Sequence, residues 1–134
     1  MSRKGHQNFL IDTEPKRGII IRHVNQEELL VTATFKLLGT STGPGVPSFF
    51  CSCVACQEAR ANPHLSRTRS GALLDTGKQK ILFDASPDLR SQLIREQIDS
   101  VDCLFISHWH YDHFGGLGEL EYYVQLKTHK PVKL

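Results

Sequence analysis

The chain has 134 residues, of which 40% are hydrophobic and 22% are charged, proportions that are ordinary for a soluble globular domain. Its 16 Lys and Arg residues nearly balance its 14 Asp and Glu residues, so charge alone implies no nucleic-acid partner. No apolar run approaches the roughly 18 residues that a membrane helix requires. Residues Met1–His6 lack the apolar core of a signal peptide. We therefore expect a cytoplasmic protein without a membrane partner.

Residues 1–28 are the least informative part of the sequence. The apolar runs Phe9–Ile11 and Gly18–Ile21 favour two short strands with a turn at Pro15. Two interpretations stay open, a poorly ordered extension or an added edge hairpin, and both are preferred to a binding role. We expect an N-terminal extension of unknown role over residues 1–28 and one domain over residues 29–134.

Alternating β-branched and aromatic residues predict a strand over Leu30–Leu38. The glycine-rich loop Gly39–Gly45 follows this strand. The loop lacks the Gly-Lys-Ser/Thr ending of a nucleotide-binding loop, and no helix opens with a Gly-x-Gly-x-x-Gly pattern. We expect instead a glycine turn that lets the backbone approach the histidine-rich site described below.

Three thiols lie within six residues, at Cys51, Cys53 and Cys56. They are too close together for an ordinary disulfide framework, whereas thiolates at this spacing can converge on one Zn²⁺. A closed structural site needs a fourth ligand, for which His64 is the nearest spare imidazole and His129 the next. The pattern favours a structural zinc over the alternatives, which are a redox pair or free thiols.

The apolar runs Ser70–Asp75 and Lys80–Asp84 predict a β-hairpin that turns at Gly77. The last residue of this hairpin, the aspartate at position 84, could orient a metal-ligating imidazole, or it could simply lead into the next helix. Arg67 and Arg69 precede the hairpin. They are candidate phosphate contacts because guanidinium groups pair well with phosphate oxygens, although such arginines are more often solvated.

Two amphipathic helices are predicted in the second half of the chain. The first starts at Ser86-Pro87-Asp88, which offers a capping oxygen, a proline for the first turn and an acid for the helix dipole. Its apolar face comprises Leu89, Leu93, Ile94 and Ile98, and that of the second helix comprises Leu117, Leu120 and Val124. In the second helix we expect one of Tyr122 and Tyr123 to pack inward.

Between these helices, the apolar strand Val101–Ile106 leads into a loop that contains His108, His110, Asp112 and His113. Three imidazoles and a carboxylate at a strand end suit metal chemistry. His108 and His110 can point the same way because side chains alternate in an extended segment. A tight turn can aim Asp112 and His113 at a second position, so one loop can serve two ions about 3.5–4 Å apart.

The motif His-x-His-x-Asp-His after an apolar strand resembles that of the metallo-β-lactamase fold, and the four residues match it position by position. The resemblance implies that His108 and His110 bind one metal ion and that Asp112 and His113 bind a second. In the family's hydrolases the aspartate also orients the attacking water, which would make Asp112 catalytic. The implied fold is α/β (α+β layered), here the N-terminal half of an αβ/βα sandwich.

The cysteine cluster narrows the resemblance. Gly39-Thr40, Cys51-x-Cys53-x-x-Cys56 and the histidine motif, in this order, are similar to the branch that contains phosphoribosyl 1,2-cyclic phosphate phosphodiesterase. Members of that branch carry a structural zinc on such a cluster, completed by a histidine near the C-terminus. Residues Asp84–Arg90 are also similar to pyrroloquinoline quinone biosynthesis protein B.

On this resemblance we expect a phosphodiesterase of a small cyclic phosphate with two divalent ions, Zn²⁺ or Mn²⁺, and one structural Zn²⁺. The alternatives are a non-catalytic metal-binding member of the cofactor-biosynthesis type, or another hydrolase such as a tRNA 3′-processing endonuclease. The family's later His, bridging Asp and final His have no match, and Lys130–Leu134 resembles the beginning of another strand. We therefore expect a fragment, inactive alone, whose missing half or second copy would cover an exposed sheet face.

Overall fold

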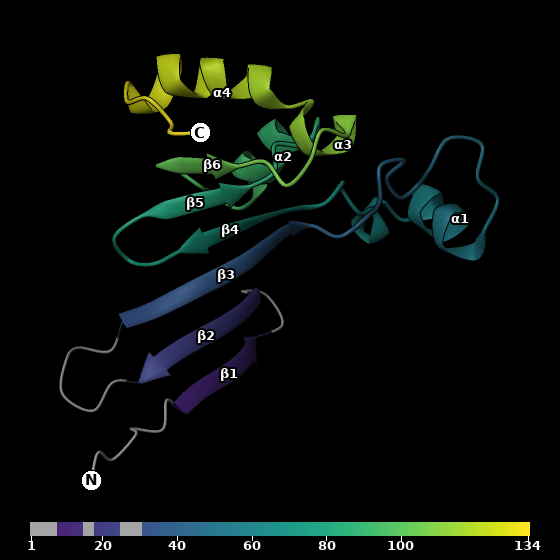
Figure 1. The fold of residues 1–134 in the computed structure, drawn as a ribbon. Helices are drawn as coiled ribbons and strands as arrows, with labels where there is room; N and C mark the ends of the chain where they lie inside the picture. Colours follow the sequence, from purple (N-terminus) through teal and green to yellow (C-terminus); the bar gives the residue numbers. More distant parts are fainter. Residues whose placement is uncertain (1–7, 15–17, 25–30) are drawn as a thin grey trace, which may run out of the picture.

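The computed structural model describes residues 8–14, 18–24 and 31–134. Within them, six strands form one sheet in the order β1-β2-β3-β4-β5-β6 (Figure 1). The strands are β1 (Asn8–Glu14), β2 (Gly18–Val24), β3 (Val31–Gly39), β4 (Gly71–Asp75), β5 (Lys80–Phe83) and β6 (Cys103–Phe105). All neighbours are antiparallel except β5 and β6, which run parallel. With the helices that cover it, this sheet makes the fold mixed α/β, as predicted.

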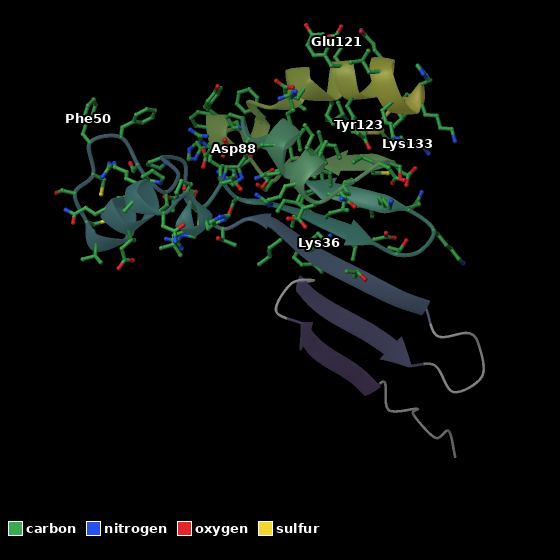
Figure 2. The ribbon with its side chains drawn as sticks, turned by 180° about the vertical axis from the view of Figure 1, so that it is seen from behind. Lys36, Phe50, Asp88, Glu121, Tyr123 and Lys133 are labelled. Atoms are coloured by element: carbon green, nitrogen blue, oxygen red, sulfur yellow. The ribbon has the colours of Figure 1, made fainter. Side chains whose placement is uncertain are left out.

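The helices occupy two places around the sheet. They are α1 (Val54–Ala61), the 3₁₀ turn η1 (Pro63–Leu65), α2 (Leu89–Arg95), α3 (Tyr111–Phe114), α4 (Leu117–Tyr123) and the π-helical turn η2 (Val124–Thr128). The connection from β3 to β4 carries α1 on an arm that projects from the sheet, whereas α2, α3 and α4 lie near β5 and β6 (Figure 1). Phe50 lies at the tip of this arm (Figure 2). Of the helices described, none is both long and apolar enough to span a membrane.

The N-terminal segment forms the edge hairpin that was one of its two predicted interpretations. β1 pairs with β2 from Asn8↔Val24 to Glu14↔Gly18, and β2 pairs with β3, so the hairpin extends the same sheet. The predicted turn at Pro15 lies outside the described residues, and the domain boundary at residue 28 stays a prediction.

The core lies between one face of the sheet and the helices α2 and α4. Its largest members are leucines from four neighbouring strands and from the two helices, namely Leu38, Leu73, Leu82, Leu104, Leu89, Leu93 and Leu120. The predicted strand Leu30–Leu38 and the hairpin turned at Gly77 are confirmed as β3 and as β4 with β5. Gly77 has a φ of 76°, a backbone conformation that glycine adopts without a steric penalty.

The structure corrects the predicted apolar face of α2. Ile94 is 63% exposed, whereas the other three apolar positions are buried and Gln92, only 1% exposed, points inward. Gln92 Nε2 donates hydrogen bonds to the carbonyl oxygen of Arg69 (2.8 Å) and to Oγ1 of Thr68 (3.1 Å). A buried amide is tolerated because it is hydrogen-bonded, and here it ties α2 to the segment that precedes β4.

The second predicted amphipathic helix is α4, which packs on the core through Leu120 and Tyr123, while Leu117 and Tyr122 are exposed. Tyr123 is therefore the tyrosine that packs inward, and its hydroxyl donates to the carbonyl oxygen of Ile98 at 3.5 Å. Burial raises the pKa of Tyr123 to about 12, with a further contribution from the nearby carboxylates of Asp99 and Asp102.

The opposite face of the sheet carries apolar side chains that no element covers within the described residues. Phe83 contacts Phe35 and Phe105, with ring centroids 6.0 Å and 5.8 Å apart. Phe105 is 56% exposed, and Leu37 is exposed beside this row. An uncovered apolar face is what half of a two-sheet sandwich would show.

The last residues of the chain extend the sheet on the far side of β6. Lys133 forms a parallel bridge with Cys103: the N–H of Leu104 donates to the carbonyl oxygen of Lys133 (2.7 Å), and the N–H of Lys133 donates to that of Asp102 (3.0 Å). Of the segment predicted to begin another strand, only Lys133 pairs with β6, as an isolated bridge. Cys103 is half-buried in this arrangement.

The two faces of α2 give a direct test of the corrected packing. Leu89→Ala removes a fully buried side chain, so we expect it to lower the free energy of unfolding by about 2–5 kcal/mol. Ile94→Ala on the same helix should change it by about 0.5 kcal/mol or less, because the side chain is exposed. Urea denaturation followed by circular dichroism measures both, and equal losses would contradict this packing.

Candidate metal centre

The histidine-rich loop connects β6 to α3 and changes conformation in its middle. His110 is extended (φ −67°, ψ 142°) and directly precedes α3, while Asp112 and His113 belong to the first turn of that helix. The N–H of His113 donates to the carbonyl oxygen of His110 at 2.8 Å, which closes this turn. The extended part therefore presents His108 with His110, and the helical turn presents Asp112 with His113.

The structure brings His108 close to His110 and Asp112 close to His113, while their role as metal ligands stays a prediction. His108 Nε2 lies 3.1 Å from His110 Nδ1, and His113 Nε2 lies 3.4 Å from Asp112 Oδ2. Ligands about 2.0–2.1 Å from a tetrahedral Zn²⁺ lie about 3.3 Å from each other, so both pairs have the separation that one ion requires. The rings of His108 and His113 are 3.9 Å apart between centroids, so the two pairs are adjacent.

Asp84, at the end of β5, holds this loop in place. Its Oδ1 accepts a hydrogen bond from the N–H of Ser107 (2.7 Å), and its Oδ2 accepts from Ser107 Oγ (2.9 Å) and lies 2.7 Å from His113 Nδ1. When His113 Nδ1 donates this hydrogen bond, the lone pair of His113 is on Nε2, which faces Asp112. This hydrogen bond is what the predicted orienting role of Asp84 requires, and the role itself stays a prediction.

The charge of Asp84 is maintained by its hydrogen bonds. Burial raises the pKa of this carboxyl, but the backbone N–H of Ser107 and the ring of His113 outweigh burial and hold the pKa below its ordinary value. Ser107 also lies within hydrogen-bond distance of His108 Nδ1 (3.0 Å) and His113 Nδ1 (3.2 Å). Sequence reasoning gave Ser107 no role, although its position between the strand and the first histidine offered a signal.

The glycine-rich loop reaches the same cluster, as expected. A Cβ atom added to Gly43 would lie 3.1 Å from Asp112 Oδ2, so the loop backbone packs directly against this carboxylate. Arg69 Nε donates to the carbonyl oxygen of Gly43 at 2.7 Å, and Arg69 Nη1 pairs with Asp88 Oδ1 at 3.0 Å. Arg67 is exposed, and its backbone pairs with Val46. The phosphate contacts of the two arginines stay a prediction.

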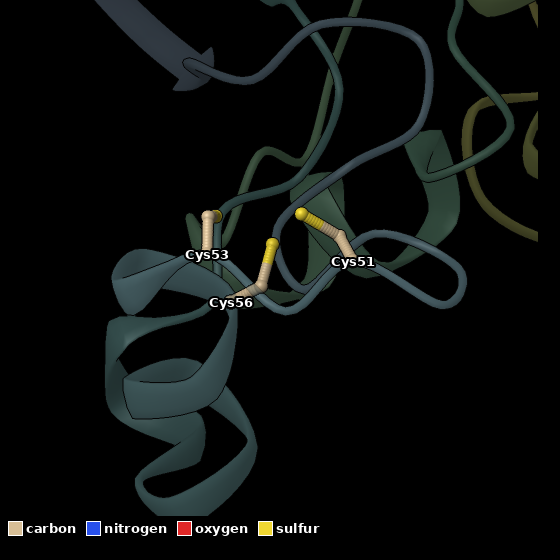
Figure 3. A group of neighbouring side chains, drawn as sticks. All are labelled: Cys51, Cys53 and Cys56. Carbon is tan, nitrogen blue, oxygen red and sulfur yellow. The ribbon is translucent and has the colours of Figure 1, made fainter.

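Cys51, Cys53 and Cys56 form a second group on the arm, at the start of α1 (Figure 3). Their sulfur atoms all lie within 4.8 Å of one another. Sulfur ligands of a tetrahedral Zn²⁺ are about 3.8 Å apart, so the group fits one ion with little movement. The group includes neither His64 nor His129, so the fourth ligand stays open.

Backbone contacts around α1 shape the cysteine group. Arg60 donates from Nη1 to the carbonyl oxygen of Cys51 (2.6 Å) and from Nη2 to that of Ser48 (2.8 Å). The N–H of Cys56 lowers the pKa of the Cys53 thiol, which precedes the helix. The N–H of Cys53 likewise lowers the pKa of the Cys51 thiol. Together, the neighbouring thiols of Cys53 and Cys56 have the larger effect and raise the pKa of Cys51 above its ordinary value. All four cysteines of the chain are free thiols.

Comparison with known proteins identifies the fold. Residues 69–133 match the model of the metallo-beta-lactamase superfamily. The crystal structure of a new diphosphatase from the PhnP family superposes with a TM-score of 0.65 and 31% identity, over 75% of this chain and 39% of that one. Zn²⁺-bound PqqB from Methylobacterium extorquens superposes with a TM-score of 0.59 and 28% identity, over 64% and 33% of the two chains.

Curated proteins match parts of this chain in sequence. Coenzyme PQQ synthesis protein B from Bradyrhizobium diazoefficiens is 44% identical over 59 residues, which are 42% of this chain and 19% of the relative. An octanoyltransferase from Porphyromonas gingivalis is 44% identical over 86 residues, 63% of this chain. Because the match covers 17% of that transferase, its name says nothing about the matched segment. The matches to these two proteins thus span less than a fifth of each.

The predicted resemblance to the metallo-β-lactamase fold superfamily is therefore confirmed, by the family match over residues 69–133 and by the two superposed structures. The fold is that of metal-dependent hydrolases, and the described similarity to PhnP-type and PqqB proteins extends beyond the matched segment to most of the chain.

Asp84 offers a test of the loop geometry. In Asp84→Asn the side chain keeps its size but loses its charge, so it no longer stabilises His113 with its proton on Nδ1. We expect the affinity of the histidine and aspartate cluster for Mn²⁺ to fall about 10–100-fold, as is typical when a partner of a metal ligand is replaced. Isothermal titration calorimetry measures this affinity, and an unchanged value would exclude the proposed orienting role.

The thiol environment predicts an order of reactivity. In reduced, metal-free protein we expect Cys53 to react with iodoacetamide before Cys56, because Cys53 is exposed with a lowered pKa and Cys56 is buried. Zn²⁺ should slow the reaction of all three arm cysteines. Cys103, outside the group, serves as the control, and mass spectrometry of the digested protein locates the modified sites. Failure of Zn²⁺ to protect the group would contradict a zinc site there.

Proposed function

We propose that this chain carries the metal-binding residues of a metal-dependent phosphodiesterase that acts on a small cyclic phosphate. The observation that carries the proposal is the pair of ligand separations, 3.1 Å and 3.4 Å, within one loop held by Asp84. The similarity to a PhnP-family diphosphatase supports a phosphate-containing substrate. The near balance of positive and negative residues favours a small substrate over a nucleic acid.

Each residue of the cluster has a distinct part in this proposal. His108 and His110 would hold one divalent ion through uncharged nitrogens, and Asp112 and His113 would hold a second with one negative charge. Divalent ions, when bound, lower the pKa of water and offset negative charge on phosphoryl oxygens. Asp112 would in addition orient the attacking water, while Asp84 keeps the proton of His113 on Nδ1 and so leaves Nε2 available.

The donor atoms restrict the choice of metal but do not fix it. Imidazole and carboxylate accept Zn²⁺ and Mn²⁺ alike, so either ion suits the histidine and aspartate cluster. Thiolates prefer Zn²⁺, and the three cysteines of the arm would hold it as a structural ion. Three thiols spaced for one metal ion suit a reducing compartment, and we propose a cytoplasmic location.

Arg67 is the better candidate for a phosphate contact of the two predicted arginines. It is exposed, and its backbone pairs with Val46 in the same loop that reaches Asp112 through Gly43. Arg69 already uses two guanidinium nitrogens for Asp88 and Gly43.

A second candidate is a non-catalytic metal-binding protein of the cofactor-biosynthesis type. The similarity to Zn²⁺-bound PqqB and to several PQQ synthesis B proteins favours it. The two candidates differ in turnover and not in metal binding.

Metal content and turnover, measured together, separate the two candidates. We expect the longest form of the protein that the gene encodes to hydrolyse bis(p-nitrophenyl) phosphate only when loaded with Zn²⁺ or Mn²⁺. His110→Ala should lower both metal content and turnover, the latter at least about 100-fold, since a metal-bound nucleophile is lost. Ile94→Ala, at an exposed position of α2 outside both candidate metal groups, is the control. Full metal occupancy without turnover would favour the non-catalytic protein.

A further inference from the structure

An ion pair between Arg69 and Asp88 lies beside the glycine-rich loop. Asp88 accepts two hydrogen bonds from the same residue, from the backbone N–H of Arg69 at Oδ2 (2.8 Å) and from Arg69 Nη1 at Oδ1 (3.0 Å). Both side chains are mostly buried. Because Asp88 directly precedes α2, the guanidinium group is fixed relative to the helical layer.

The fixed guanidinium group in turn holds the glycine-rich loop. Arg69 Nε donates to the carbonyl oxygen of Gly43 at 2.7 Å. Backbone hydrogen bonds also hold the loop on either side of Gly43. The N–H of Ser41 donates to the carbonyl oxygen of Thr68, and the N–H of Val46 donates to that of Arg67, each at 3.0 Å. The position of Gly43 is therefore set by residues that lie more than 20 positions later in the chain.

Gly43 lies so close to the carboxylate of Asp112 that an added Cβ atom would require this side chain to shift by a few tenths of an ångström. A Cβ atom there would be 3.1 Å from Oδ2, 3.2 Å from Cγ and 3.5 Å from Oδ1 of Asp112. Its φ is not in the left-handed region, unlike that of Gly45 and Gly77. The backbone conformation at position 43 therefore tolerates a side chain, and the Asp112 carboxylate is the group that a side chain there would displace.

We propose that Gly43 is a positioning residue for Asp112, held in place by the Arg69–Asp88 ion pair. The loop backbone limits the movement of the carboxylate and keeps Oδ2 toward His113 Nε2, at a separation suited to one ion. This inference rests on the metal cluster of the proposed function and goes beyond it, because it gives Arg69, Asp88 and Gly43 a role in metal geometry. Arg69 then acts on the metal site and not on a substrate phosphate.

The test compares two glycine-to-alanine variants in the 134-residue chain. Gly43→Ala should lower the affinity for Mn²⁺ about tenfold or more, because Asp112 must move to make room for the methyl group. Gly118→Ala is the matched control, since nothing lies within 4 Å of its Cβ position, and it should leave the affinity unchanged. Mn²⁺ is used because it prefers oxygen and nitrogen ligands to the thiolates of the arm.

A second variant and a second readout distinguish positioning from a general loss of structure. Arg69→Lys cannot donate to Asp88 and to Gly43 in the same geometry, so it should also weaken Mn²⁺ binding, whereas Arg67→Lys should not. Binding of Co²⁺ to the three cysteines, followed by thiolate-to-cobalt charge-transfer absorption, should stay as in the wild type in every variant. The urea midpoint of the metal-free protein reports folding.

The outcomes separate the two proposals. If the wild type binds Mn²⁺ and both Gly43→Ala and Arg69→Lys bind it equally well, the positioning role is wrong and the metal cluster stands. If both variants lose Co²⁺ binding at the cysteines as well, the loop acts on the whole structure and the positioning role is again wrong. If the wild type binds neither Mn²⁺ nor Zn²⁺ at the histidines, the proposed function fails and this inference fails with it.

Discussion

The hydrogen bonds of Asp84 are the interaction on which the rest of the site depends. β5 and β6 are parallel neighbours, so their carboxyl ends meet at one edge of the sheet, and Asp84 lies beside Ser107 there. The N–H of Asp84 donates to the carbonyl oxygen of Phe105, the last residue of β6, so the backbone of Asp84 is hydrogen-bonded to the end of that strand. A short strand pair thus places the Asp84 carboxylate beside the histidine-rich loop, where it contacts Ser107 and His113 Nδ1.

The connection from β3 to β4 carries the cysteine group and contacts the histidine and aspartate cluster, which lies on the loop from β6 to α3. The segment after β3 passes Asp112 at Gly43 and reaches Cys51, the first cysteine of the arm, a few residues later. Its backbone is paired with the segment that leads into β4, which includes Arg67. The arm is therefore joined to the histidine cluster through a braced loop, and a structural zinc on the arm would restrain the end of that loop that lies away from the sheet.

Local patterns predicted most of the elements. Alternating apolar residues identified β3, β4 and β5, and the predicted change from an extended segment to a tight turn is present between His110 and Asp112. The sequence could not predict that Gln92 would replace Ile94 inside α2, because the partners of this amide precede β4. For the same reason the sequence did not indicate that Arg69 pairs with Asp88. The carboxylate of Asp88 is predicted to interact with the dipole of the following helix, yet in the structure it pairs with Arg69. Contacts between distant segments, and not misjudged propensities, account for these differences.

The backbone of Asp84 restricts which amino acids can occupy its position. Its φ of 62° lies in the left-handed region, which side chains other than those of Gly, Asn and Asp enter at a steric cost. Of these three, glycine offers no acceptor and asparagine no charge, so aspartate alone meets both demands. Glutamate, with the same charge, would fail on the backbone. Natural variation at this position should therefore be close to nil in proteins that keep the metal cluster, and an Asn or Gly there would mark a relative that has lost it.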